Sequence, residues 1–319
     1  MSYPNTRVRQ AGVRRFRRVG AGLLAALVAI AVVAVAAVGS LWLSLAGIKR
    51  DPTLLPQNGA AVESVPGALN LLLIGTDSHL VRGNADVMML VHLDASRKSV
   101  HLISVPRDLL IERPDGAVRL SRVYADGGSV ATVEAVQQLL GIHIDHVALT
   151  WLNGMSRLID LLGGVPVDNP VAASSNGFAF PRGQITLSGE ESLAFVRQGP
   201  TGPGELDRAE SQRLVLQGIA TRLLTSSSLS NPGTVKAVLD QLAADVVVDS
   251  DLDARRMVEL FVGLRVQAGV QDLRAIKLPT AGRGTTPTGD GFVRPDPERM
   301  ITLGRAINSD TLQDWVRNR

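Results

Sequence analysis

The residue types best suited to chemistry in this chain are arginine and aspartate, which recur at the predicted ends of strands and helices and in loops. The set consists of Asp77, Asp86, Arg82, Arg107, Arg119, Arg122, Arg197 and Arg208. A guanidinium is a planar fork that binds two phosphate oxygens at once, so several converging arginines indicate a polyanionic ligand. Asp77 and Asp86 flank one loop, where two carboxylates can hold Mg²⁺ together with phosphate oxygens and water.

Arginine, aspartate and Mg²⁺ together are suited to pyrophosphate chemistry. The cations stabilise charge on a leaving phosphate, and a carboxylate accepts the proton of an attacking hydroxyl. The alternative is purely structural, because exposed Arg–Asp pairs are common and each contributes little to stability. Residue types and spacing alone leave both interpretations open. The chain has no cysteine, no nucleotide-binding glycine motif and no HExxH or GxSxG motif, which excludes thiolate metal sites and several hydrolase classes.

The segment that must position these side chains is residues 69–108, which contains three apolar runs of strand length. They are residues 69–74, 87–93 and 100–105, all rich in Leu, Val, Ile and Met. Continuous apolar runs bounded by turn residues favour strands that are buried on both faces. Charged residues sit where these runs begin or end, and charges at the mouths of core strands indicate a site at a sheet edge.

Strands and helices alternate along the rest of the chain. Helices are predicted over residues 129–140, 153–164, 189–197, 206–224, 234–242, 252–264, 296–307 and 311–316. A glycine-rich loop is predicted over residues 281–291. The links between the first three strands are too short for helical crossovers. We therefore predict an α/β fold with a mixed central sheet flanked by helices, an α-β-α sandwich.

The N-terminal region predicts a membrane anchor. Residues 1–18 contain six arginines and no acid, and residues 19–48 contain no charged side chain. That run exceeds the roughly 20 residues that cross a bilayer as a helix, and it is longer than the apolar core of a signal peptide. The positive-inside rule places the N-terminus in the cytoplasm. We predict a basic cytoplasmic tail (1–18), a single transmembrane helix (19–48), a proline-containing linker (49–68) and an extracytoplasmic domain (69–319). A cleaved leader is the alternative.

Composition and charge limit the classes of partner that this domain can bind. Hydrophobic residues make up 45% of the chain and aromatic residues only 3%, which predicts a largely aliphatic core. The formal charge is +3, but the basic tail supplies six positive charges, leaving about −3 for the rest. A net negative domain on the outer side of a membrane argues against nucleic-acid binding.

Seven ordered blocks carry a resemblance to a known family. They read LNLLLIGTDS, DVMMLVHLD, SVPRD, RLSRVYADGG, HVALTWLNGMSRLIDLLGGVPVD, LSGEESLAFVRQ and ELDRAESQR. The chain, over about residues 69–224, resembles the LytR-CpsA-Psr family. The resemblance implies a membrane-anchored phosphotransferase that moves a glycopolymer from a polyprenyl-diphosphate carrier to peptidoglycan. It also implies Mg²⁺ as cofactor, and an apolar tunnel for the lipid with arginines at one end.

The resemblance also implies roles for individual residues. Asp77 and Asp86 correspond to the Mg²⁺-linked carboxylates, and together with Arg107 they are the implied catalytic group. The implied diphosphate-binding residues are Arg82, Arg107, Arg119, Arg197, Arg208 and Gln212. The chain departs from the family pattern at Gly199, where a second arginine is usual.

Two other functions stay open at this point. One is a non-catalytic envelope scaffold that binds lipid diphosphate or glycopolymer, which the loss of arginine at Gly199 favours. The other is a polyprenyl-diphosphate hydrolase, in which water replaces the acceptor. The expected partners are a polyprenyl-diphosphate-linked glycopolymer, a peptidoglycan acceptor and membrane lipid.

Overall fold

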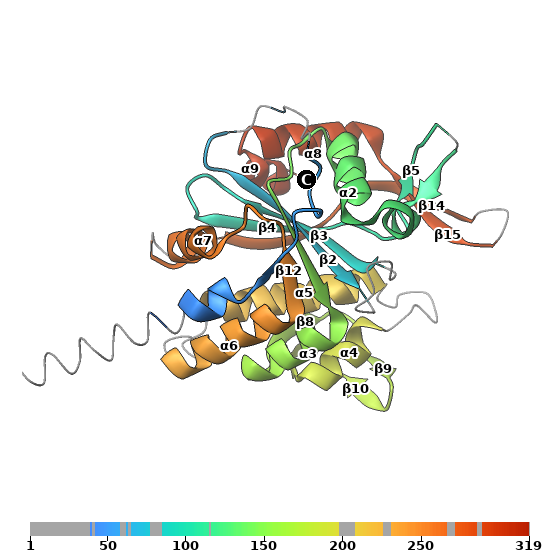
Figure 1. The fold of residues 1–319 in the computed structure, drawn as a ribbon. Helices are drawn as coiled ribbons and strands as arrows, with labels where there is room; N and C mark the ends of the chain where they lie inside the picture. The colour runs from blue at the N-terminus through green and yellow to red at the C-terminus, as the bar shows by residue number, and fades with distance from the viewer. Residues whose placement is uncertain are drawn as a thin grey trace, which may run out of the picture.

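The computed structural model describes residues 39, 42–57, 62, 65–76, 85–114, 116–197, 208–225, 231–266, 272–285 and 289–318. Within them, a seven-stranded sheet lies between two layers of helices (Figure 1). In spatial order its strands are β1 (Lys49–Arg50), β12 (Val246–Val248), β7 (His146–Trp151), β2 (Leu69–Thr76), β3 (Ala85–Leu93), β4 (Ser99–Ser104) and β13 (Asp272–Lys277).

The sheet is mixed, as predicted. The strands β2, β3 and β4 form an antiparallel meander, while β7 runs parallel to β2 and β13 runs parallel to β4. The meander consists of the three apolar runs of residues 69–108, and β4 is buried along its whole length. Burial on both faces explains why these runs are continuously apolar rather than alternating.

Helices cover both faces of the sheet (Figure 1). One layer contains α2 (Leu120–Leu140), α8 (Pro297–Asn308) and α9 (Leu312–Arg317), and the other contains α3 (Leu152–Leu161), α4 (Gly189–Val196), α5 (Arg208–Thr225) and α6 (Pro232–Asp245). The first layer packs on fully buried sheet residues such as Leu72, Ile74 and Leu90. On the other face, Leu216 of α5 packs against the cluster of Met89, Val100 and Leu102.

Smaller elements complete the layers. They are the paired strands β8 (Val165–Asn169) with β11 (Gly183–Leu187), β9 (Ala173–Ser175) with β10 (Phe178–Phe180), and β5 (Leu110–Ile111) with β6 (Val118–Arg119), and the helix α7 (Ala254–Val266). Local sequence sets where several helices begin. Ser188 and Glu191 form a capping box at α4, and the Asp296 side chain accepts a hydrogen bond from the backbone of Arg299 at α8.

The largest differences from the sequence prediction concern the start of α2 and the glycine-rich segment 281–291. The helix α2 begins at Leu120 instead of at Ser129, because the chain is already helical before a kink at Gly128, whose φ is +66°. Glycine tolerates that left-handed backbone, so the helix resumes beyond it. The predicted glycine-rich loop of residues 281–291 is also wrong, because its two ends belong to an antiparallel hairpin of β14 (Thr280–Thr285) and β15 (Gly291–Pro295).

The N-terminal predictions fall partly outside the described residues. Most of the predicted membrane helix, residues 19–48, lies there. Among the residues that the structure describes, no helix combines the length and apolarity of a membrane span. Residues 42–46 form a short helix, and Leu45 and Ile48 pack against Val248. The segment assigned to a linker supplies the edge strand β1, and its Leu54 belongs to the main core.

Candidate functional site

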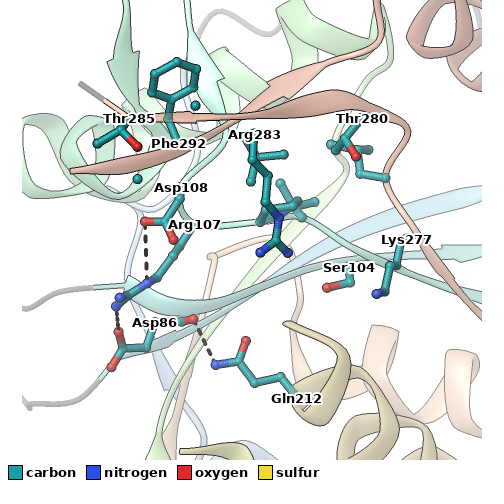
Figure 2. Close-up of a pocket in the computed structure, with 16 residues that line it drawn as sticks. Asp86, Ser104, Arg107, Asp108, Gln212, Lys277, Thr280, Arg283, Thr285 and Phe292 are labelled. Atoms are coloured by element: carbon teal, nitrogen blue, oxygen red, sulfur yellow. Dashed lines mark hydrogen bonds and ion pairs between the residues drawn. The ribbon is translucent and has the colours of Figure 1, made fainter. Parts of the chain in front are cut away.

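A cavity of about 550 Å³ opens at one edge of the sheet. It lies where β2, β4 and β13 end and β3 begins, because β3 runs antiparallel to β2 and β4. Figure 2 shows side chains from the start of β3, from the ends of β4 and β13 and from the β14–β15 hairpin around it. The lining side chains include Asp86, Ser104, Arg107, Asp108, Gln212, Lys277, Thr280, Arg283, Thr285 and Phe292.

Asp86 and Arg107 form the centre of one end of this cavity. Asp86 is the second residue of β3, and Arg107 follows β4, so two antiparallel neighbours bring them together. Their side chains form an ion pair in which Arg107 Nη1 donates to Asp86 Oδ1. Each is partly exposed to the cavity, with 34% of Arg107 and 19% of Asp86 accessible. The turn that carries Arg107 is held by α2, since the backbone N–H of Ser121 donates to the Arg107 carbonyl at 2.8 Å.

Helix α5 approaches the same end of the cavity from the opposite layer. Gln212 Nε2 donates to the backbone carbonyl of Asp86 at 3.2 Å (Figure 2). Arg208 begins α5 one helical turn before Gln212, so the two positions lie on the same face of the helix. The backbone thus places the start of α5 beside the Asp86–Arg107 pair.

A charged cluster joins α5 to β13 at the other end of the cavity. Glu210 pairs with Lys277 Nζ at 2.6 Å and also with Arg213, which donates to the Ala275 carbonyl at 3.1 Å. Burial alone would raise the pKa of Glu210, but hydrogen bonds from Arg213 and Lys277 outweigh it and lower the pKa. Glu210 is therefore a charged carboxylate that ties the first turns of α5 to the end of β13.

The β14–β15 hairpin forms the outer wall of the cavity. Its attachment runs through the backbone, because the N–H of Val293 donates to the Asp108 carbonyl at 2.8 Å. Asp108 lies 3.7 Å from Arg107 Nε and 3.8 Å from Arg119 Nη1, and Arg119 Nη2 lies 3.4 Å from Asp290. Arg119 is therefore linked to the site through Asp108.

The predicted site residues divide into three groups. Asp86, Arg107 and Gln212 line the cavity. Arg119 is not among the lining residues, but it pairs with Asp108, which is one of them. Arg197 caps the end of α4, is exposed and is not among the residues that line the cavity. The positions of Asp77 and Arg82, and the side chain of Arg208, lie outside what the structure describes, as does Gly199.

Arg122, which the sequence groups with the converging arginines, is not among the residues that line the cavity. It lies in the first turn of α2 and pairs with Asp126 at 2.8 Å, one turn along the same helix. It is also exposed, with 67% of its side chain accessible. Conversely, Lys277 and Arg283 line the cavity although sequence reasoning did not select them. Lys277 lies at the end of the apolar and charged run of residues 272–277, and Arg283 lies inside the predicted loop.

The donor set at the Asp86 end fits a hard divalent cation. Mg²⁺ in proteins is held by one or two carboxylates and completes its shell with water and phosphate oxygens. Asp86 supplies a carboxylate at the cavity, with Asp108 nearby. Among the described side chains, Asp86, Asp108 and Asp290 form ion pairs there with Arg107 and Arg119.

Comparisons with known proteins agree on one family. The model of the LytR_cpsA_psr family matches residues 49–287. The polyisoprenyl-teichoic acid–peptidoglycan teichoic acid transferase TagU of Halalkalibacterium halodurans is 31% identical over 196 residues, covering 60% of this chain and 64% of TagU. The cell wall biosynthesis protein LcpA of Corynebacterium glutamicum is 29% identical, covering 60% of this chain and 46% of LcpA. The chain thus spans less than two thirds of either relative.

The fold is also found in solved structures. The crystal structure of Bacillus subtilis TagV superposes with a TM-score of 0.62, covering 78% of this chain and 98% of TagV at 21% sequence identity. At that identity the likeness establishes the fold alone. It agrees with the mixed sheet and flanking helices described above.

Proposed function

The chain belongs to the LytR-CpsA-Psr family, and from this premise we propose that it is a phosphotransferase of cell-wall assembly. It moves a glycopolymer from a polyprenyl-diphosphate carrier to a hydroxyl of peptidoglycan. The name of TagU describes a transfer of this kind. The observation that carries the proposal is the Asp86–Arg107 ion pair at the rim of the cavity, with Gln212 bonded to the backbone beside it.

Each of these groups has a chemical task in the transfer. The incoming diphosphate partly displaces Asp86 from Arg107. The guanidinium of Arg107 then binds phosphate oxygens and stabilises charge on the leaving polyprenyl phosphate. Asp86 orients the arginine and accepts the proton of the attacking hydroxyl. Gln212 holds the backbone of Asp86 through its hydrogen bond. Arg208 begins the same helix one turn before Gln212 and is the second arginine assigned to the diphosphate.

The cofactor proposed for this site is Mg²⁺, with Asp86 and Asp77 as its carboxylate ligands. When bound, it would neutralise charge on the diphosphate. We also propose that residues 19–48 anchor the domain in the cell membrane with the N-terminus in the cytoplasm, and that the lipid tail occupies an apolar tunnel. These proposals rest on the sequence and the family.

The test uses the full chain in detergent, a polyprenyl-diphosphate-linked glycopolymer, peptidoglycan and Mg²⁺. Asp86→Asn and Arg107→Ala should each reduce transfer by at least about a hundredfold, the usual effect of removing one group that stabilises a transition state. The matched control is Arg157→Ala, because Arg157 also pairs with an aspartate, Asp245, but on α3 away from the cavity. EDTA should abolish transfer and added Mg²⁺ should restore it.

The products separate the alternatives. Free glycopolymer with water as acceptor identifies a hydrolase, and tight binding of the donor without any product identifies a scaffold. If Asp86→Asn and Arg107→Ala transfer as fast as Arg157→Ala, the residue assignment is wrong.

A further inference from the structure

The end of the predicted membrane span is folded into the domain. Residues 42–46 form a short helix in which Ser44 and Leu45 are buried. The Ser44 hydroxyl donates to Asp240 of α6 at 2.5 Å, and Leu45 packs with Ile48 in an apolar cluster that also contains side chains of α6 and α7. Figure 1 shows this short helix, in blue, beside α6. The chain is therefore attached to α6 and α7 from Ser44 onward.

This attachment leaves no spacer between the proposed anchor and the domain. Residues 19–41 are uncharged, and they still exceed the roughly 20 residues that cross a bilayer as a helix. The helix of residues 42–46, which contacts α6 and α7, follows that stretch directly. A span that ends at Trp42 therefore holds α6 and α7 within one helix diameter, about 10 Å, of the bilayer surface.

The side chains exposed at this place fit a boundary between lipid and water. Among the described residues, Leu43 is the most exposed large apolar side chain, at 72%, and its neighbour Trp42 is 47% exposed. Indole side chains are enriched at the level of the lipid headgroups. Lys49 and Arg50 follow on the edge strand β1, where both are exposed and neither pairs with an acid among the described residues. Apolar and basic side chains thus lie next to each other where the chain enters the domain.

The acidic side chains of the flanking helices are engaged within the protein. On α6, Asp240 accepts a hydrogen bond from Lys236 at 2.5 Å in addition to the one from Ser44. On α7, Glu259 lies 3.0 Å from Arg255, which is itself 80% exposed. These carboxylates are neutralised by neighbouring cations, so they oppose an anionic surface less than free carboxylates would.

We propose that the edge formed by β1, the 42–46 helix, α6 and α7 docks on the surface of the membrane, with anionic phospholipid headgroups as its partner. Lys49 and Arg50 attract the headgroups, and Trp42 and Leu43 enter the interface. The inference rests on the proposed anchor and goes beyond it, because it fixes the orientation of the whole domain. The cavity then keeps one orientation toward the membrane that supplies its lipid donor.

Fluorescence quenching in nanodiscs tests this orientation. The chain has no cysteine, so single-cysteine variants of the full chain each carry one fluorophore. The nanodiscs contain phosphatidylglycerol, phosphatidylcholine and a lipid with a nitroxide on its headgroup. A probe at Arg255→Cys should lose most of its fluorescence. The matched control is Arg122→Cys, which should lose little, because Arg122 is also an exposed helical arginine paired with an acid one turn later, but it lies on α2 in the other layer.

Three outcomes overturn the proposal. A probe at Leu43→Cys reports on the anchor itself, so strong quenching there with equal quenching of Arg255→Cys and Arg122→Cys leaves the anchor in place and removes the docking. No quenching at Leu43→Cys removes both. A probe at Arg255→Cys that dimerisation shields from water in detergent, and that nitroxide lipid does not quench, assigns this edge to a second copy of the chain.

The charge of β1 supplies the second measurement. With the probe at Arg255→Cys, replacing Lys49 and Arg50 together by Gln should shift the ratio of docked to undocked domain roughly thirtyfold toward the undocked state, since each basic residue near an anionic leaflet contributes about fivefold. The matched control combines Arg122→Gln with Arg305→Gln, which removes the same charge from α2 and α8 and should leave the ratio unchanged.

Omitting phosphatidylglycerol should also favour the undocked state. An equal response to both double variants, or none to the omission, overturns the assignment to anionic headgroups. Neither measurement involves transfer, so a failure of the proposed reaction leaves the docking standing, and a failure of the docking leaves the reaction standing.

Discussion

The substitution His101→Leu should remove part of the pH dependence of folding. His101 lies on β4, is 1% exposed, and both of its ring nitrogens are buried without a hydrogen-bond partner among the described residues. Burial, followed by the nearby His92, lowers the pKa of His101 from 6.5 to about 4. The folded protein therefore keeps the ring neutral at a pH where the unfolded chain binds a proton.

The sign and size follow from these two pKa values. Between pH 6.5 and pH 4 the unfolded state binds more protons at His101, so wild-type stability falls as the pH falls through that window. Between pH 7.5 and pH 5, proton linkage at His101 should lower the free energy of unfolding of the wild type by about 2 kcal/mol. His101→Leu has no proton to bind, so its stability relative to wild type should rise by about 2 kcal/mol over the same change.

Urea unfolding at pH 7.5, 6.0 and 5.0 measures that difference. The matched control is Leu102→Val, the neighbouring buried position on β4, where a smaller apolar side chain should cost about 1 kcal/mol at every pH. A difference between His101→Leu and wild type that stays constant from pH 7.5 to pH 5.0 would refute the reasoning. The burial of an unpartnered imidazole would then not depress its pKa.

Two further predictions concern how the helices are fixed. Glu210→Gln should destabilise the protein by about 1–3 kcal/mol in urea unfolding, because Arg213 is largely buried and both it and Lys277 lose a charged partner. Since the pKa of Glu210 is lowered, that advantage of wild type should be full above pH 4.5 and should shrink as the pH falls through the folded-state pKa. A difference in unfolding free energy that does not shrink as the pH is lowered below 4.5 contradicts the ion-pair explanation. Gly304→Ala should lower the Tm and cost about 2–3 kcal/mol, because its Cβ would lie 1.7 Å from the Leu140 carbonyl and force α8 away from α2. An unchanged Tm would show that these helices separate freely.

The central part of the fold could be predicted because its signals are local. The three apolar runs of residues 69–108 became β2, β3 and β4, and the short links between them predicted antiparallel pairing. That pairing places the start of β3 beside the end of β4. The meeting of Asp86 and Arg107 therefore follows from two strands and one short connection.

The errors arose where local signals were weak or ambiguous. Glycines at residues 282, 284, 289 and 291 predicted a loop, yet cross-strand packing such as that of Phe292 on Gly284 supports a hairpin. Gly128 favours a helix boundary in the sequence, but in the structure it is a kink within α2. Arg122 was grouped with the site by residue type, but its place on a helix directs it to Asp126.

The sequence by itself determined the identity of the core strands, the mixed character of the sheet, the family, and the Asp86–Arg107 end of the cavity. Only the tertiary structure decided which other charges join that cavity. The parallel pairing of β13 with β4 brings Lys277 beside Ser104, and the attachment of Val293 to Asp108 brings the hairpin with Arg283 over it. Hydrophobic periodicity and turn residues act over a few positions and so can be read from the chain. The pairing of strands more than a hundred residues apart depends on how whole layers pack, which no local pattern encodes.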